Sequence, residues 1–389
     1  MKIANRKNRN RLISAAIVVI FIVLAMTPLV PEAEVSSCLM VTALGIDSED
    51  GVIKLTAETS DGTATESVHG EGIRVTDAMQ DLNERYGRKI ELKHCGVIVM
   101  GGEMSADDIS FALMSLLSEA AINAGCAVVS SSAQAGEFIQ KAVKLAKASG
   151  SGVTSYIGFA DTSSSVFIPT ALNVMSELRS KSAATALPVF EIVESDAATG
   201  SQNAQNSGSD GGGTSSGSSE EMTELKSPYR ARAVGSTAFE LSESETLGLM
   251  LFSKRANGGL INTEWEYNGE SRIIQGEISS KSTDIKVRYE GGRVIAELKA
   301  EAVIRFVDRF IVIEQGNGEN VINKLAATLE EAFTRTLSGY VRDIAEVTRR
   351  EDVLGLRTKL YRSSPQDYKA IPPDLASAGF DISVSVKVS

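Results

Sequence analysis

The chain has 389 residues, a formal net charge of −11 and 43% hydrophobic residues, which is enough for two or three domains with cores of their own. Such an acidic chain lacks the basic patch that phosphate groups require, so we expect no nucleic acid partner and no adhesion to anionic lipid. Three cysteines give no framework of disulfide pairs. We expect three small buried side chains, with a Cys95–Cys126 bridge as an alternative outside the cytosol.

Residues 1–33 combine a basic flank with an uncharged segment. Leu12–Val30 contains no charged residue; five basic side chains precede it, and the next basic residue after it is Lys54. As a helix, this segment would rise about 28 Å, close to the roughly 30 Å hydrocarbon core of a bilayer. Because positive flanks resist translocation, the pattern predicts a membrane anchor with the remaining chain on the outer side of the membrane.

The same segment has two further interpretations. Leu12–Met26 alone has the length of a signal-peptide core, and cleavage near Ala25 would release the ectodomain. Val35–Cys38 resembles a lipid-attachment box, although Pro31–Glu34 separates it from the apolar segment. We expect an uncleaved anchor and keep a cleaved signal peptide and lipid attachment as alternatives.

Residues 34–195 have the pattern of one α+β domain, with short apolar runs alternating with amphipathic stretches. Strands are predicted at Cys38–Asp47, Val52–Glu58, Cys95–Met100, Cys126–Val129 and Val189–Val193. Helices are predicted at Thr76–Tyr86, after the cap residue Ser105, at Ala133–Lys147 and at Ile168–Leu178.

Residues 196–227 differ abruptly in composition. Ala197–Ser219 consists almost entirely of small and polar residues, which cannot bury enough apolar area to offset the entropy of ordering. We therefore predict a flexible insertion, placed either between two domains or within one domain as a long loop. Gly213–Gly217 formally matches a serine hydrolase elbow around Ser215, but that elbow requires a strand before it and a helix after it.

Residues 228–270 form a predicted middle α+β region. Tyr229–Glu240 has the pattern of a single strand, in which Gly235 marks a bulge or a close approach. Ser242 begins a helix that runs to Met250, and Leu260–Tyr267 contains the only tryptophan, Trp265.

Residues 271–389 form a predicted C-terminal domain. Asp284–Tyr289 and Val294–Ile304 have the pattern of a hairpin, and Glu319–Arg349 is the longest amphipathic stretch in the chain. Strict alternation from Phe380 to Val388 predicts a last strand that pairs with the hairpin, while the long helix covers the sheet. The predicted fold class is therefore α+β: several small mixed-sheet domains behind an N-terminal transmembrane or signal segment.

The residues that could carry chemistry are few. The two histidines, His69 and His94, are expected in a loop and at a strand edge, and no zinc, phosphate-loop or dinucleotide motif is present. Asp107-Asp108 and Glu330-Glu331 are expected at a helix start and on a solvated helix face, where adjacent side chains diverge. We therefore predict no catalytic, cofactor-binding or metal-binding residues and no enzymatic activity.

Four stretches carry a family resemblance. Residues 34–47 read EVSSCLMVTALGID, residues 88–102 read RKIELKHCGVIVMGG, residues 235–249 read GSTAFELSESETLGL, and residues 352–368 read DVLGLRTKLYRSSPQDY. In order and spacing these resemble the Ger(x)C family, the C subunits of spore germinant receptors. The sequence departs from the family because no lipid-attachment cysteine stands just before Glu34, and because the low-complexity insertion is long.

The resemblance implies a non-enzymatic subunit of a germinant receptor complex, needed for germination in response to nutrients. It implies A-type and B-type integral-membrane receptor subunits as partners, and a location at the spore inner membrane. The alternative is a solitary extracytoplasmic binding protein for peptidoglycan or a small solute, and a hydrolase is a third, remote hypothesis.

Overall fold

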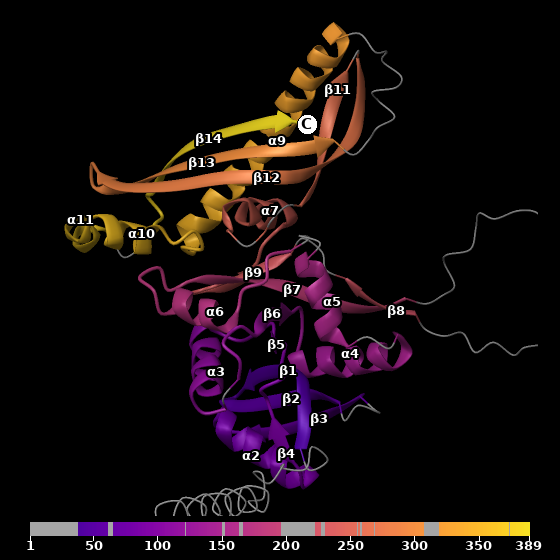
Figure 1. Ribbon diagram of the computed structural model, residues 1–389. Coiled ribbons are helices and arrows are strands. Elements are labelled where there is room, and N and C mark those ends of the chain that lie inside the picture. The colour runs from indigo at the N-terminus through magenta and orange to yellow at the C-terminus, as the bar shows by residue number, and fades with distance from the viewer. Residues whose placement is uncertain are drawn as a thin grey trace, which may run out of the picture.

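The computed structural model describes residues 38–60, 65–120, 122–149, 152–162, 166–195, 222–226, 230–254, 256, 259–267, 269–306, 319–372 and 374–389. The segment Leu12–Val30, the box preceding Cys38 and the stretch Ala197–Ser219 lie outside these residues, so what was expected of them stays a prediction. Among the helices that are described, none is both long and apolar enough to cross a membrane. Figure 1 shows two lobes, the N-terminal one in indigo and magenta and the C-terminal one in orange and yellow.

The N-terminal lobe is built on a mixed sheet with strand order β10-β9-β7-β6-β5-β1-β2-β3, in which β4 also pairs with β1 and β8 with β7. The strands β1, β5, β6 and β7 run parallel to one another. The strands are β1 (Cys38–Glu49), β2 (Val52–Ser60), β3 (Thr65–Gly72), β4 (Lys89–Glu91), β5 (Val97–Met100), β6 (Ala127–Ser131), β7 (Thr185–Ser195), β8 (Met222–Lys226), β9 (Ala231–Val234) and β10 (Ala238–Glu240). The helices are α2 (Val75–Tyr86), α3 (Ala106–Ser118), α4 (Ala135–Ser149), α5 (Val153–Thr162) and α6 (Ala171–Leu178).

Helices cover both faces of this sheet, which explains why its parallel strands are continuously apolar. On β5, Val97 and Val99 pack into a cluster with α4 and α5. Ile98 and Met100 point to the opposite face, into a cluster with α2, α3 and α6. A strand buried on both faces has apolar residues at every position, whereas a half-buried strand alternates apolar and polar residues. The strands β1, β5 and β6 were predicted from such continuous apolar runs.

The C-terminal lobe is a four-stranded sheet in the order β11-β12-β13-β14, with helices packed on one face. Its last strand runs parallel to β13, and β12 and β13 form an antiparallel hairpin. This arrangement confirms the predicted pairing of the last strand with the hairpin. The elements are α7 (Glu243–Phe252), β11 (Leu260–Tyr267), β12 (Glu270–Glu290), β13 (Arg293–Phe306), α9 (Glu319–Arg350), α10 (Leu356–Ser363), α11 (Pro365–Ala370) and β14 (Gly379–Val388).

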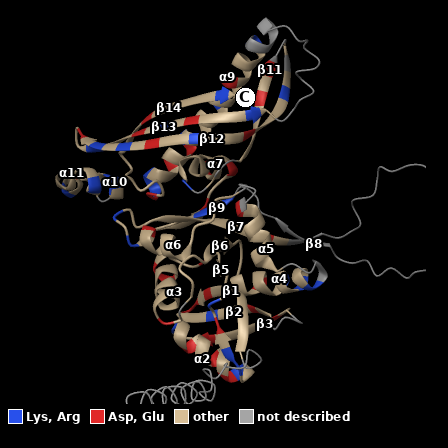
Figure 2. Cartoon of the chain, viewed as in Figure 1, with Lys and Arg blue, Asp and Glu red and all other residues tan. Residues whose placement is uncertain are grey.

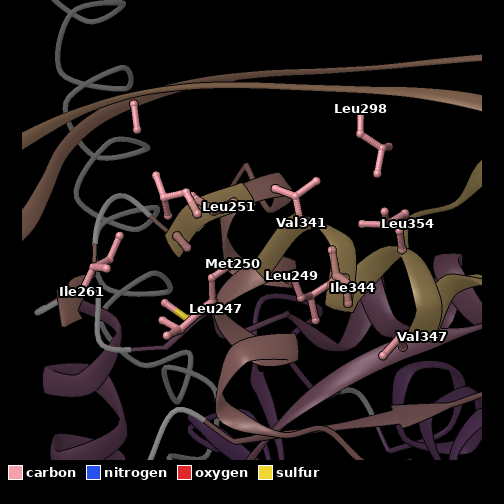
Figure 3. Packing of buried hydrophobic residues seen from close by; sticks show 14 of the residues in the cluster. Leu247, Leu249, Met250, Leu251, Ile261, Leu298, Val341, Ile344, Val347 and Leu354 are labelled. Atoms are coloured by element: carbon pink, nitrogen blue, oxygen red, sulfur yellow. The ribbon is translucent and has the colours of Figure 1, made fainter. Parts of the chain in front are cut away.

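The long helix α9 packs an apolar stripe into the core of this lobe. Its apolar stripe, which includes Leu329, Phe333 and Leu337, is buried against the inner face of the sheet. Figure 3 shows Leu251 of α7, Val341 of α9 and Leu298 of the sheet, which belong to one buried cluster. The outer face instead carries alternating charges along β12 and β13 (Figure 2), as expected of a sheet covered on one side only.

Several local predictions were wrong or incomplete. The run Tyr229–Glu240 is two strands, β9 and β10, because the chain turns at Gly235, whose N–H bonds to the Thr237 carbonyl. The helix predicted at Ile168–Leu178 begins only at Ala171, after Pro169. His69, expected in a loop, lies on β3, paired with Thr56 of β2.

The predicted middle region does not stand apart from its neighbours. Strand β9 pairs with β7 in the N-terminal sheet, whereas β11 pairs with β12 in the C-terminal sheet. Residues 228–270 are thus divided between the two lobes. The α+β class with mixed sheets is confirmed, because both sheets combine parallel and antiparallel pairs.

Candidate functional site

The residues singled out for possible chemistry are not assembled into a reacting site. His69 and His94 are both exposed, on β3 and in the connection between β4 and β5. Ser215 lies outside the described residues. Over the part of the chain that the structure describes, no group of three or more His, Cys, Asp or Glu side chains could hold a metal ion.

Two of the cysteines meet in the N-terminal core. Cys95 and Cys126 are both buried free thiols with their Sγ atoms 4.0 Å apart. The contact with Cys95, followed by burial, raises the pKa of the Cys126 thiol. Because the thiolate is the nucleophilic form, this environment suits packing rather than reactivity.

The carboxyl edge of the parallel strands holds a buried carboxylate. Asp47, near the end of β1, accepts hydrogen bonds from the backbone N–H groups of Ala135 (2.8 Å) and Gly136 (2.9 Å) at the start of α4. Burial raises the pKa of Asp47, and the two hydrogen bonds oppose that rise. A Cβ at Gly101 would lie 2.2 Å from Oδ1 of Asp47, so only glycine fits beside this carboxylate.

The loop that follows β5 is held from the other side of the sheet by a buried arginine. Arg232 of β9 is 5% exposed and donates to the carbonyl oxygens of Gly101 (3.0 Å) and Met104 (2.9 Å). Burial lowers the pKa of Arg232. A cleft of about 190 Å³ lies at this edge, lined by acidic, small and amide side chains that include Asp47, Glu103 and Gln134. Its described lining contains no base paired with a nucleophile.

A second cluster joins the two lobes, and we call it the lobe joint. It consists of Ser182, Gly235, Ser236, Thr237 and Phe239 on one side and Arg350, Glu351 and Thr358 on the other. Glu351, at the end of α9, accepts four hydrogen bonds from Ser236 (N 3.1 Å, Oγ 2.6 Å) and Thr237 (N 2.6 Å, Oγ1 2.8 Å). A Cβ at Gly235 would lie 2.1 Å from Oε2 of Glu351. The close approach predicted at Gly235 is therefore confirmed, and its cause is this carboxylate.

Two further contacts complete the lobe joint. The guanidinium of Arg350 stacks over the ring of Phe239, 3.8 Å from the ring centroid. The Thr358 hydroxyl lies 2.9 Å from the Ser182 hydroxyl and accepts from the Ser182 N–H at 3.1 Å. The carboxylate and the cation–π pair thus fix the end of α9, and the hydroxyl pair fixes α10, against the N-terminal lobe (Figure 1).

Arg232 and Glu351 were not among the residues predicted from the sequence to hold the fold or to form a site. A signal was available for Arg232, which interrupts an apolar strand in the run Ala231–Val234. Glu351 is one of several charged residues at and just after the end of a long helix, and no local pattern in the sequence distinguishes it from Glu346. Its partners lie 114 and 115 residues away, so only the tertiary structure brings them together.

The comparisons with known proteins match both lobes. The family model described as spore germination protein N-terminal domain matches residues 32–192, and the model described as spore germination B3/GerAC like, C-terminal, matches residues 235–389. The crystal structure of the GerBC protein aligns with a TM-score of 0.47 and 12% sequence identity, over 89% of this chain and 96% of that chain. No curated protein matches the chain.

Proposed function

The chain belongs to the Ger(x)C family of spore germination proteins, and from this premise we propose that it is the C subunit of a spore germinant receptor. In this role it is a non-enzymatic component needed for germination in response to nutrients. Its partners are the A-type and B-type integral-membrane subunits of the receptor. It works at the spore inner membrane, with both lobes on the outer side.

One observation supports a role in assembly most strongly. The stretches that carry the family resemblance supply the residues that fix the fold: Asp47 and Gly101 at the sheet edge, and Gly235 and Ser236 at the lobe joint. These residues hold backbone segments in place, and their polar groups are directed at other parts of the chain. A two-lobed body whose segments are held by such contacts is suited to contact with other subunits.

The experiment that tests the non-enzymatic role is a germination assay on spores carrying single substitutions, with protein level measured in parallel. His69→Ala, His94→Ala and Ser215→Ala should leave the response largely intact. Leu329→Ala and Phe333→Ala remove buried side chains, and each should cost roughly 2–5 kcal/mol of stability through cavity formation. Their response should fall in step with protein level. Loss of response at normal protein level in a histidine or serine variant would favour the hydrolase hypothesis.

Partnership is tested by affinity purification of the tagged full chain from detergent-solubilised spore membranes. We expect the A-type and B-type subunits to purify with it. Purification of the chain alone, with germination unaffected by its deletion, would instead favour a solitary binding protein for peptidoglycan or a small solute.

Anchoring is a separate part of the proposal. If Leu12–Val30 is an uncleaved anchor, the mature protein begins at or near Met1 and resists extraction by carbonate. A mature N-terminus beyond Ala25 would show that a signal peptide is removed, and a lipid on Cys38 would support the third interpretation.

A further inference from the structure

A cleft of about 280 Å³ lies where the two lobes meet. The N-terminal lobe contributes residues before and along α6 and on β7, and the C-terminal lobe contributes the end of α7, one side chain of β12 and the connection from α9 to α10. The lining residues are Phe167, Pro169, Glu177, Ala186, Leu249, Phe252, Ser253, Lys254, Ile285, Val353, Leu354 and Lys359. A ligand held here would touch both lobes at once.

The lining of the cleft is part apolar and part polar. Phe167, Leu249 and Leu354 are each 7% exposed, and Phe252 and Ile285 are half-buried against the same cluster. Small-molecule sites commonly combine apolar side chains with a few polar groups at defined places. The cleft therefore offers an apolar group a contact surface beside its polar side chains.

Two lysines supply the charge. Lys254 follows the end of α7 and is exposed, while Lys359 lies on α10 and is half-buried. Among the described residues, neither ammonium group has a carboxylate within the 4.0 Å of an ion pair. Other basic side chains of this lobe form such pairs, among them Lys286, Arg288 and Lys299.

The electrostatic surroundings of Lys359 are consistent with a missing counterion. Burial, followed by the positive charge of Lys254, lowers the pKa of Lys359. Arg362 lowers it further, whereas Asp284 and Asp352 raise it from a distance. Glu177, the one acidic side chain of the lining, accepts a hydrogen bond from Thr185 at 2.6 Å. An anion between the two lysines would reduce this repulsion, which Asp284 and Asp352 offset only in part.

We propose that the interlobe cleft binds a small organic anion, with a carboxylate between Lys254 and Lys359 and an apolar group against Phe252 and Leu354. This inference goes beyond the proposed function and stands independently of it, because it concerns the two lobes of this chain alone. Binding would connect α6 and β7 of one lobe with α7 and α10 of the other, and would stabilise their relative placement.

The test uses the full chain in neutral detergent and isothermal titration calorimetry with benzoate, which combines a carboxylate with an apolar ring. Benzamide has nearly the same shape without the charge and serves as the matched ligand. We expect benzoate to bind at millimolar concentrations or below, at least about tenfold more tightly than benzamide, and more tightly at low salt. Equal affinity for the two compounds, or no binding of benzoate, would overturn the proposal without the use of any variant.

Variants locate the site. Lys254→Gln and Lys359→Gln should each weaken benzoate binding about tenfold, and the double variant should abolish it. Lys299→Gln removes the same charge from the outer face of the C-terminal sheet and should leave the affinity unchanged. A melting curve of each variant establishes that it is folded. Unchanged affinity in the folded double variant would show that benzoate binds elsewhere.

Discussion

Three of the buried carboxylates in this protein act as caps for backbone N–H groups. Asp47 caps the start of α4, Asp352 accepts from Leu356 and Arg357 at the start of α10, and Glu351 holds the turn between β9 and β10. A buried carboxylate left without such donors would be costly, since desolvation disfavours its charge. At each of these positions, the backbone segment that donates the hydrogen bonds therefore requires a carboxylate side chain.

The first prediction concerns Glu351. In Glu351→Ala, two backbone N–H groups and two hydroxyls of the lobe joint lose their acceptor, and we expect a loss of about 1–3 kcal/mol in the free energy of unfolding. The control is Glu346→Ala on the same helix, which removes only an exposed pair with Arg349 and should cost below about 1 kcal/mol. Urea denaturation measures both, and equal losses would show that the lobe joint contributes nothing of its own.

The second prediction concerns pH and Glu58. This side chain is 1% exposed, its Oε2 has no hydrogen-bond partner among the described residues, and burial raises its pKa above 4.5. Because the folded pKa lies above the unfolded one, the native state binds the proton more tightly. The charged form therefore lowers stability above the raised pKa, and this penalty disappears as the pH falls towards 4.5.

Glu58→Gln should accordingly raise the melting temperature at pH 7 and give little or no gain near pH 4. Glu66→Gln makes the same change at an exposed position on the neighbouring strand β3 and should show no such pH dependence. A gain for Glu58→Gln that is equal at both pH values would mean that the charge of Glu58 is not the cause.

At the scale of elements, the crossing of α7 and α9 depends on one glycine. A Cβ at Gly248 would lie 2.2 Å from the carbonyl oxygen of Tyr340, which belongs to the backbone of α9 and cannot rotate away. The two helices consequently approach each other more closely there than any other residue would permit. The same helix α9 also contains Gly339, whose Cβ would meet nothing within 4 Å.

The third prediction uses this pair of glycines. Gly248→Ala should push the two helices apart and destabilise the protein by about 1–3 kcal/mol or more. Gly339→Ala should stabilise it by up to about 1 kcal/mol, because alanine has the higher helix propensity and has room. Thermal melts of the two variants should move in opposite directions, and a stable Gly248→Ala protein would contradict the close approach.

The sequence predicted the elements that have a strong local signal. The apolar stripe of α9 repeats every three or four residues, and the alternation of β14 has a period of two, so both were found with nearly correct ends. Elements with a weak or mixed signal were missed: β3, β4, β8, α5, α10 and α11. Strand β8 pairs with β7 and lies within residues 196–227, so the last part of the predicted flexible insertion was wrong. The first part of β12 was missed because Ser279–Asp284 is polar and gives no strand pattern. This segment is a strand because it pairs with β13.

At the scale of the whole molecule, the lobe joint could not be predicted. Ser236 and Glu351 are 115 residues apart, and Ser236 donates to the Glu351 carboxylate. No pattern in the sequence near either residue predicts this hydrogen bond. The sequence did indicate a bulge or a close approach at Gly235, but it did not indicate that Glu351 is the residue that approaches. The interlobe cleft was missed for the same reason, because its lining comes from segments across the whole second half of the chain and part of the first.

The fourth prediction concerns residues 197–219, which lie outside the described residues. The predicted linker contributes no apolar run to any core, so its removal should leave the melting temperature nearly unchanged. Differential scanning calorimetry of the shortened and complete chains makes the comparison. A fall of many degrees would show that the segment packs against the protein.

The pairing of β9 with β7 has a consequence for proteolysis. These strands lie on opposite sides of residues 196–229 in the chain, yet they are neighbours in one sheet, and Arg232 anchors β9 to the loop after β5. A single cut introduced between residues 197 and 219 would therefore leave two fragments that share a sheet. Such a nicked protein should run as two bands on a denaturing gel and as one particle in gel filtration, because noncovalent pairing holds the halves together.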